Sequence, residues 1–313
     1  MKNRRFALAI ACLASLVAGG CGNEGPASDA QSKATAKGAK KVVEDKVPPY
    51  SYAAPVKGQI KEENIGEFKL VDGIAYTALA CGTVVYVASK PIASPMLVDS
   101  ACPLSQARAL SKLRNASFVE VTLDAAGRSK YFAAGTPFGG SLTDKTLRAW
   151  SSALKMDADH AAGNVAHRRY GRFEFDLPLS NPKFDEISYG DREQKRRLGA
   201  TTPKPSEQAV TAAYVALRDA ALKKDLKATL SAMGFDAKQV AAIRGMDGID
   251  ADFLVFADRF LTPGTPGDPW SRPGSGQVRG EGLKASGKKY FNDYYFDLCG
   301  DHLVLTGIVE QTP

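Results

Sequence analysis

The predominant spacing of apolar residues differs between two regions of this chain, and that difference limits the fold more than any other feature. Between residues 65 and 178, apolar and polar residues alternate in short runs separated by turn residues, as in half-buried strands. From 206 to 260 the apolar residues recur every three or four positions, which is typical of amphipathic helices. Three strand-like runs follow at 277–285, 289–298 and 302–309. The sequence therefore predicts an α+β protein.

The first region begins with short strands that we expect to pair as an antiparallel meander. Asp72-Gly73 stands between two apolar runs, a position in which Asp-Gly is a strong hairpin signal. Residues 104–113 carry apolar side chains at helical spacing, and 143–154 repeats this pattern. The last run, 170–177, alternates again. We predict a β-rich, sandwich-like domain over 65–178 with one or two helices.

The second region is separated from the first by a segment with few apolar residues. Residues 179–205 contain several Pro and Gly residues and are typical of a linker. Over 206–313 the order of elements predicts helices packed on an antiparallel sheet. Over 206–311 that order resembles the nuclear-transport-factor-like (cystatin-like) group, whose helices cover a curved sheet and leave a cone-shaped cavity. The resemblance implies a cavity that serves as an enzyme site, a ligand pocket or an inert scaffold.

Residues 1–20 have the pattern of a secretory signal. Three basic residues precede an apolar run at 6–17 that is too short to span a membrane as a helix. Small residues Ala18-Gly19-Gly20 then lead directly to Cys21, an arrangement that resembles the lipobox of bacterial lipoproteins. The resemblance implies that the signal is removed and that Cys21 becomes the lipidated first residue, held in the membrane by its acyl chains.

The residues after Cys21 refine this expectation. In lipoproteins an aspartate after the cysteine commonly marks retention at the inner membrane, whereas this chain has Gly22. The resemblance therefore implies the periplasmic face of the outer membrane in a Gram-negative host. Residues 21–64 are predicted to form a disordered tether, because their first part is rich in Ala, Ser, Gly and Lys. An ordinary signal followed by an incidental thiol is the alternative interpretation.

Three of the five cysteines remain for the folded part once Cys12 leaves with the signal and Cys21 is lipidated. Disulfides are common in exported proteins, and a bond between Cys81 and Cys102 would close a loop of about 20 residues, worth ~3 kcal/mol in the chain-entropy model. We expect this pair. Cys299 is then a buried strand residue, although three pairings are open, including those that use Cys299.

Signals for catalysis, metal binding or nucleic-acid binding are weak throughout the sequence. The three histidines lack zinc-binding spacing, and there is no C-x-x-C or phosphate-binding glycine motif. Asp247, Asp250 and Asp252 lack the spacing of a calcium loop and are predicted to cap a helix. The net charge is +7, with its one dense basic cluster, Lys195-Arg196-Arg197, in the linker. We predict no catalytic residues, metal, cofactor or nucleic-acid partner.

Three residues remain as candidates for contact with a ligand or partner. Asp293 and Tyr295 share one face of the strand at 289–298, where a carboxylate beside a phenol can bind a ligand or act as a base. Alternating aromatic and acidic residues also suit a half-buried sheet, and this structural role is the preferred interpretation. Trp270 lies in a long loop and can contact a partner or pack over the sheet edge.

Three functions stay open from the sequence. The leading hypothesis is a non-enzymatic periplasmic lipoprotein that binds a protein, an envelope component or a small ligand. A cavity enzyme that uses Asp293 and Tyr295 in the second region is an alternative. The third is an immunity or inhibitor lipoprotein that blocks a secreted toxin at the membrane. The balance favours a protein that is not an enzyme, anchored through Cys21 and bound to a protein or envelope partner.

Overall fold

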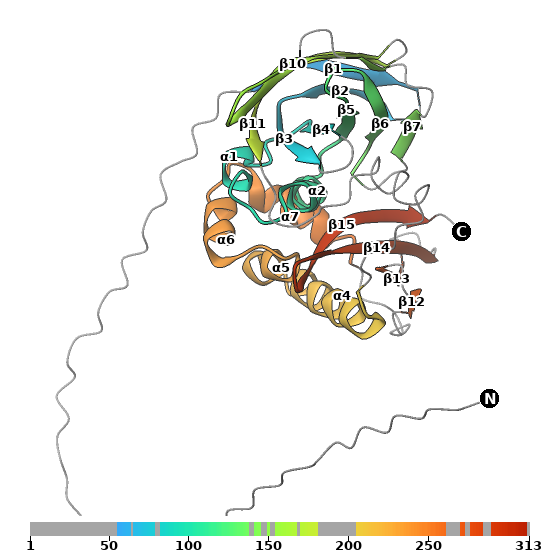
Figure 1. Ribbon diagram of the computed structural model, residues 1–313. Helices are drawn as coiled ribbons and strands as arrows, with labels where there is room; N and C mark the ends of the chain where they lie inside the picture. Colours follow the sequence, from blue (N-terminus) through green and yellow to red (C-terminus); the bar gives the residue numbers. More distant parts are fainter. Residues whose placement is uncertain are drawn as a thin grey trace, which may run out of the picture. The chain divides into compact units, whose positions relative to one another are not determined.

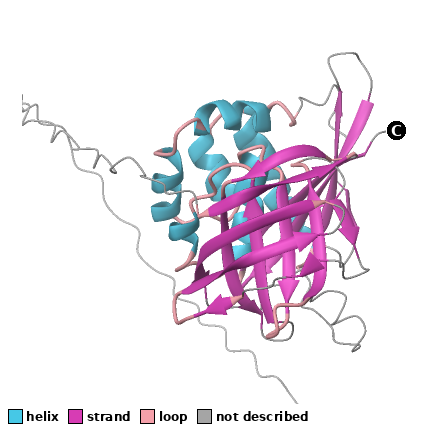
Figure 2. Ribbon diagram, turned by 90° about the horizontal axis from the view of Figure 1, so that it is seen from above, coloured by secondary structure: helices cyan, strands magenta, loops and turns pink. Residues whose placement is uncertain are grey.

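The fold is known from a computed structural model. It describes residues 55–63, 65–78, 82–137, 141–144, 149–150, 154–167, 170–180, 205–260, 270–272, 276–283 and 289–311. The predicted signal, Cys21 and most of the predicted linker lie outside the described residues. Residues Lys46–Pro313 form one compact unit. The fold is α+β, with helices gathered beside strands of two sheets (Figure 2).

The larger sheet curls back on itself (Figure 1). Its strand order is β2-β1-β11-β3-β4-β5-β6-β7, while β10 pairs with β11, β8 and β9. The pairings are antiparallel except for a short parallel one between β11 and β3. Its described strands are β1 (Val56–Glu62), β2 (Gly66–Leu70), β3 (Asp72–Ala78), β4 (Gly82–Ala88), β5 (Phe118–Leu123), β6 (Ser129–Gly135), β7 (Ser141–Asp144), β8 (Ala149–Trp150), β9 (Lys155–Met156), β10 (His160–His167) and β11 (Gly171–Ser180).

The helices and the smaller sheet complete the unit. The smaller sheet is antiparallel, in the order β12-β13-β14-β15. Helix α2 contacts β3 and β4 of the large sheet as well as β15 of the small one, and lies between them (Figure 1). These elements are α1 (Ser94–Leu97), α2 (Pro103–Leu113), α4 (Glu207–Leu222), α5 (Leu226–Ala232), α6 (Ala237–Arg244), α7 (Ile249–Ala257), β12 (Trp270–Arg272), β13 (Gln277–Leu283), β14 (Lys289–Cys299) and β15 (His302–Gln311).

The central strands β3, β4 and β5 separate two apolar cores. Because side chains alternate along a strand, Val85 and Val87 of β4 enter one core while Val84 and Tyr86 enter the other. We call the first the strand core, since it lies within the curl of the large sheet. Its members are Val56, Ile60, Leu70, Ala75, Val85, Val87, Val119, Val121, Leu123, Phe132, Ala134, Ala161, Val165, Tyr170, Phe173, Phe175, Leu177 and Leu179.

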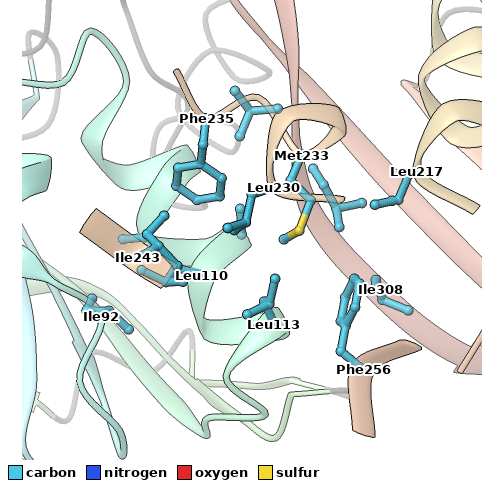
Figure 3. Packing of buried hydrophobic residues seen from close by; sticks show 14 of the residues in the cluster. Ile92, Leu110, Leu113, Leu217, Leu230, Met233, Phe235, Ile243, Phe256 and Ile308 are labelled. Atoms are coloured by element: carbon cyan, nitrogen blue, oxygen red, sulfur yellow. The ribbon is translucent and has the colours of Figure 1, made fainter. Parts of the chain in front are cut away.

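The second core, which we call the helix core, joins the two predicted domains. It includes Tyr86 of the large sheet. Figure 3 shows the part of this core where Leu110 of α2, Leu217 of α4 and Ile308 of β15 lie. Aliphatic side chains of α5 and α6 and phenylalanines of α7 fill the space between them, together with Met233 after α5 and Met246 after α6. The boundary between 178 and 206 therefore separates the two sheets but does not separate the core.

Local sequence signals explain the helix starts in the second region. The Ser206 hydroxyl accepts a hydrogen bond from Ala209 N at 3.2 Å and caps the start of α4. Asp236 and Gln239 form a reciprocal capping box at the start of α6. Asp250 and Asp252 lie in the first turn of α7, where acidic residues favour the helix dipole.

Three predicted elements are wrong. Asp72-Gly73 begins β3 and does not turn a hairpin, because β2 pairs with β1 and β3 pairs with β4. Residues 143–154 do not form a helix: 141–144 and 149–150 are strands, paired with β6 and β10. Those partners come from distant parts of the chain and override the helical spacing. The predicted tether, 21–64, contains β1, whose Val56 and Ile60 are buried in the strand core.

The disulfide also differs from the expected pair. Cys102 is bonded to Cys299, 197 residues away, and not to Cys81, which lies outside the described residues. Helix α2 packs beside β15, and the turn after β14 brings Cys299 to the start of α2. The bond therefore joins the two regions of the chain, a consequence of tertiary packing that sequence spacing does not show.

Candidate functional site

Helix α2 organises the polar groups of the interior. All eleven of its residues are buried, including Gln106, Arg108, Ser111 and Lys112. A helix buried on every side has to find partners for its polar side chains in the elements around it. The elements that supply these partners surround α2 and are therefore the candidates for forming a site.

A pocket of about 780 Å³ lies at the N-terminal end of α2. One wall comes from α1 and the turn that leads into α2, and the other from the α5–α6 turn and the β14–β15 hairpin. Both apolar and polar groups line it. The lining residues are Pro95, Met96, Asp99, Ser100, Ala101, Gln106, Ser231, Gly234, Phe235, Asp236, Lys238, Gln239, Ala242, Cys299, His302 and Leu303.

A pair of glutamine amides joins the two walls. Gln106 Nε2 donates to Gln239 Oε1 at 3.0 Å, and Gln239 Nε2 donates to Gln106 Oε1 at 2.7 Å. Gln106 Nε2 also donates to the Gly234 carbonyl at 3.0 Å, while Ser100 Oγ donates to Gln106 Oε1 at 2.7 Å. Both glutamines are more than nine-tenths buried. The network fixes the position of both side chains in the pocket.

One hydrogen of this network has no acceptor in the part of the chain that the structure describes. An amide nitrogen carries two hydrogens, and Gln239 Nε2 uses one of them for Gln106. Gln239 Oε1 already accepts two hydrogen bonds, one from Gln106 Nε2 and one from Asp236 N at 3.0 Å. Gln239 lines the pocket, so an oxygen acceptor on a ligand can bind the remaining N–H.

The rim of the pocket carries charges of both signs. Asp99, Asp236 and Lys238 are exposed, and the His302 side chain is about half exposed, at 49%. His302 Nδ1 lies 3.5 Å from Asp301 Oδ1. Apolar surface comes from Met96, Phe235 and Leu303. A mixed lining of this kind suits binding of a ligand with apolar parts and a few polar groups.

The interior beyond the pocket contains a buried ion pair and a buried amine. Arg108 Nη2 lies 2.5 Å from Glu120 Oε2 of β5, with side-chain exposures of 4% and 0%. Lys112, one turn further along α2, lies over the Phe118 ring at 5.1 Å. Burial and then the positive charge of Arg108 lower the pKa of Lys112 to about 7.

The sequence-predicted candidates do not form this site. Asp293 is buried on β14, and Tyr295 packs against Gly307 of β15. Because Tyr294 faces the rings of Tyr214 and Phe260, its two neighbours lie on the opposite face of the sheet. Neither Asp293 nor Tyr295 lines the pocket. Trp270 is the first residue of β12, and its backbone pairs with β13. The structure does not describe its side chain.

A second cluster of polar groups lies in the exposed turn between β9 and β10. Ligand atoms of Asp157, Asp159 and His160 all lie within 4.8 Å of one another. The Asp157 carboxylate accepts hydrogen bonds from the backbone N–H groups of Asp159 and His160, so the turn itself explains the arrangement. The hydrogen bond with Asp159 raises the pKa of His160. We assign no metal to this turn.

The pocket residues were missed because they come from distant parts of the sequence. Gln106 and Gln239 are 133 positions apart, and no spacing rule joins them. One local signal was present, because Asp236 followed three residues later by Gln239 is a capping-box pattern. A glutamine among the apolar residues of 104–113 was a second indication of a buried polar contact.

Comparisons of the chain with protein-family models, curated proteins and solved structures find no match. Among the helices that the structure describes, none has the length and apolar character needed to cross a membrane. The assignment of function therefore depends on the sequence and the site.

Proposed function

We propose that this protein is a binding protein of the bacterial envelope whose ligand occupies the pocket at the start of α2. The observation that carries the proposal is the amide of Gln239, which lines a pocket of about 780 Å³ and is fixed there by two hydrogen bonds with Gln106. One of its N–H groups has no acceptor among the described residues. Ligand pockets typically measure about 300–1,000 Å³ and combine apolar surface with a few fixed polar groups. The ligand class is a small molecule or short peptide with a carbonyl-type acceptor.

The anchor and the compartment form a separate part of the proposal. The pattern Ala18-Gly19-Gly20-Cys21 supports lipidation at Cys21 and a place on the periplasmic face of the outer membrane. Cys21→Ala should then move the protein from the membrane to the soluble fraction, whereas Cys12→Ala should leave it on the membrane. If the Cys21→Ala protein stays in the membrane fraction, the anchor is not at this residue.

The cavity-enzyme alternative is not favoured, because Asp293 and Tyr295 lie outside the pocket. The resemblance of 206–311 to the nuclear-transport-factor-like group also stays a proposal. Tyr214, Phe260 and Tyr294 fill the layer between the helices and the small sheet, with ring centroids 4.8 and 5.2 Å apart. The pocket that we propose lies at the end of the sheet, beside the β14–β15 hairpin.

Native mass spectrometry of the full chain purified from bacterial cells tests the binding proposal. We expect a small molecule or peptide to accompany the wild-type protein and to be lost from Ala242→Trp, which fills the pocket. Leu254→Trp is the matched control, because Leu254 is 44% exposed and lies outside the pocket. Equal occupancy in both variants, or none in the wild type, would contradict the proposal.

A further inference from the structure

The two cysteines of the Cys102–Cys299 disulfide differ in their position relative to the pocket. Cys299 is among the residues that line the pocket, whereas Cys102 is not among those described there. Both residues are almost fully buried, with 0% exposure for Cys102 and 1% for Cys299. A small thiol that enters the pocket therefore approaches the bond from the Cys299 side.

The two cysteines also differ as leaving groups. Cys102 is the N-cap residue of α2, an eleven-residue helix whose N-terminus has no side-chain cap among the described residues. The N–H groups and the dipole at a helix N-terminus stabilise a thiolate. Cys299 ends a strand next to the Gly300 turn and lacks such a helix end. Because a more stable thiolate leaves faster, Cys102 is the better leaving group.

A histidine is the cross-strand partner of the cysteine on the pocket side. Cys299 and His302 are direct partners across the β14–β15 pair, so their side chains share one face of the sheet. Both residues line the pocket. An imidazole can accept the proton of an incoming thiol, and the thiolate is the form that attacks a disulfide.

From these positions we propose that Cys102–Cys299 is a thiol–disulfide exchange site, attacked at Cys299 through the pocket by a dithiol reductant. The reductant loses a proton to His302, and its thiolate sulfur bonds to Cys299 Sγ. The Cys102–Cys299 bond breaks, and its electron pair leaves with Cys102 as a thiolate. The second thiol of the reductant then displaces Cys299. Two electrons have passed, leaving an oxidised reductant and two reduced cysteines.

Exchange at this bond changes the pocket directly. The disulfide links the wall from the start of α2 to the wall from the β14–β15 hairpin. Once it is reduced, the amide pair of Gln106 and Gln239 still joins α2 to α6, but the hairpin loses its covalent link to α2. The inference concerns the bond itself and does not depend on the identity of a ligand.

Incubation of the folded full chain with glutathione, followed by acid quenching, alkylation and peptide mass spectrometry, tests the proposal. We expect glutathione on Cys299 and the alkylating reagent on Cys102, with a preference of roughly tenfold or more. Glutathione on Cys102, equal labelling of both residues, or no reaction until urea unfolds the chain would each overturn the assignment. The wild-type protein suffices for this experiment, so no variant has to fold.

The role of the histidine needs a separate pair of variants. His302→Asn should slow native-state exchange by roughly tenfold or more. His160→Asn makes the same substitution at an exposed histidine outside the pocket and should leave the rate unchanged. Equal slowing in the two variants would show that His302 does not act on the incoming thiol.

Discussion

The two faces of the central strands bury their side chains against different surroundings. On one face, the strand core packs aliphatic and aromatic side chains from neighbouring strands, with His167 stacked on Tyr170 at 4.2 Å. On the other face, the helix core packs against α2, whose buried polar groups bond to residues of β5 and α6. Polar groups able to bind a ligand therefore concentrate where a helix is surrounded by other elements, and not where strands pack on strands.

The largest effect is expected from the buried ion pair on the α2 side. Glu120→Gln should lower the free energy of unfolding by about 3–5 kcal/mol, because it leaves Arg108 charged and buried without its partner. Urea unfolding monitored by circular dichroism measures the change. Val121→Ala is the matched control on the opposite face of β5 and should cost roughly 2 kcal/mol. A larger loss for Val121→Ala would reverse the comparison between the two faces.

The disulfide should give the next largest effect. The double variant Cys102→Ser and Cys299→Ser should lose about 2–5 kcal/mol, since the bond closes a long loop in the unfolded chain. Scanning calorimetry should show the same decrease in Tm for the wild-type protein after reduction. Cys81→Ser should leave Tm unchanged, because Cys102 is bonded elsewhere. A decrease for Cys81→Ser that matches the double variant would restore the pairing expected from the sequence.

The sequence predicted the fold best where the signal is local. Alternation placed a strand at 170–177 and helical spacing placed a helix at 104–113, close to the observed β11 and α2. The prediction failed at 143–154, where apolar spacing fits a helix but distant strands determine the structure. It also failed at β1, whose Val56 and Ile60 follow a segment of tether-like composition.

The pocket was harder to predict than the fold. Its two walls come from residues 95–106, 231–242 and 299–303, and only packing of α2 beside β15 brings them together. The disulfide pairing failed for the same reason, since Cys81 is nearer to Cys102 in sequence but Cys299 is nearer in space. Spacing along the chain predicts elements, whereas sites made from several elements need the tertiary structure.

Replacing the buried amine of Lys112 should give a smaller change in the free energy of unfolding, and this change is a gain and not a loss. Its pKa of about 7 lies below the ordinary 10.5, so the unfolded chain holds a proton that the folded chain releases between these values. The free energy of unfolding of the wild type should therefore rise with pH from about 7 to 10.5. Lys112→Met should raise stability by a few kcal/mol at or below pH 7, with a gain that disappears toward pH 10.

Thermal unfolding across this pH range distinguishes burial from charge alone. Lys238→Met removes an exposed lysine at the pocket and is the control for loss of a lysine charge; it should change the free energy of unfolding by less than about 0.5 kcal/mol. If Lys112→Met gives the same gain at pH 6 and pH 10, then added apolar packing explains it, and the amine does not limit stability on this face.

The smallest predicted effect concerns the other end of α2. Asp252 of α7 lies 2.6 Å from Lys90 Nζ and 3.0 Å from Arg114 Nε, and so connects α7 to the end of α2 and to the segment after β4. Asp252→Asn should cost about 1 kcal/mol, because Lys90 is 37% exposed and solvent weakens its share. Urea unfolding at low and high salt measures this loss, which should shrink as salt screens the pair.

Asp250 provides the matched control for this ion pair. It also lies in the first turn of α7, but it is exposed and has no ion pair with any described residue. Asp250→Asn therefore removes only the interaction of an acidic residue with the helix dipole, worth about 0.3–1 kcal/mol. The difference between the two variants isolates the contacts with Lys90 and Arg114. If the losses are equal, the dipole explains both, and the helix side of the central strands gains no stability from this pair.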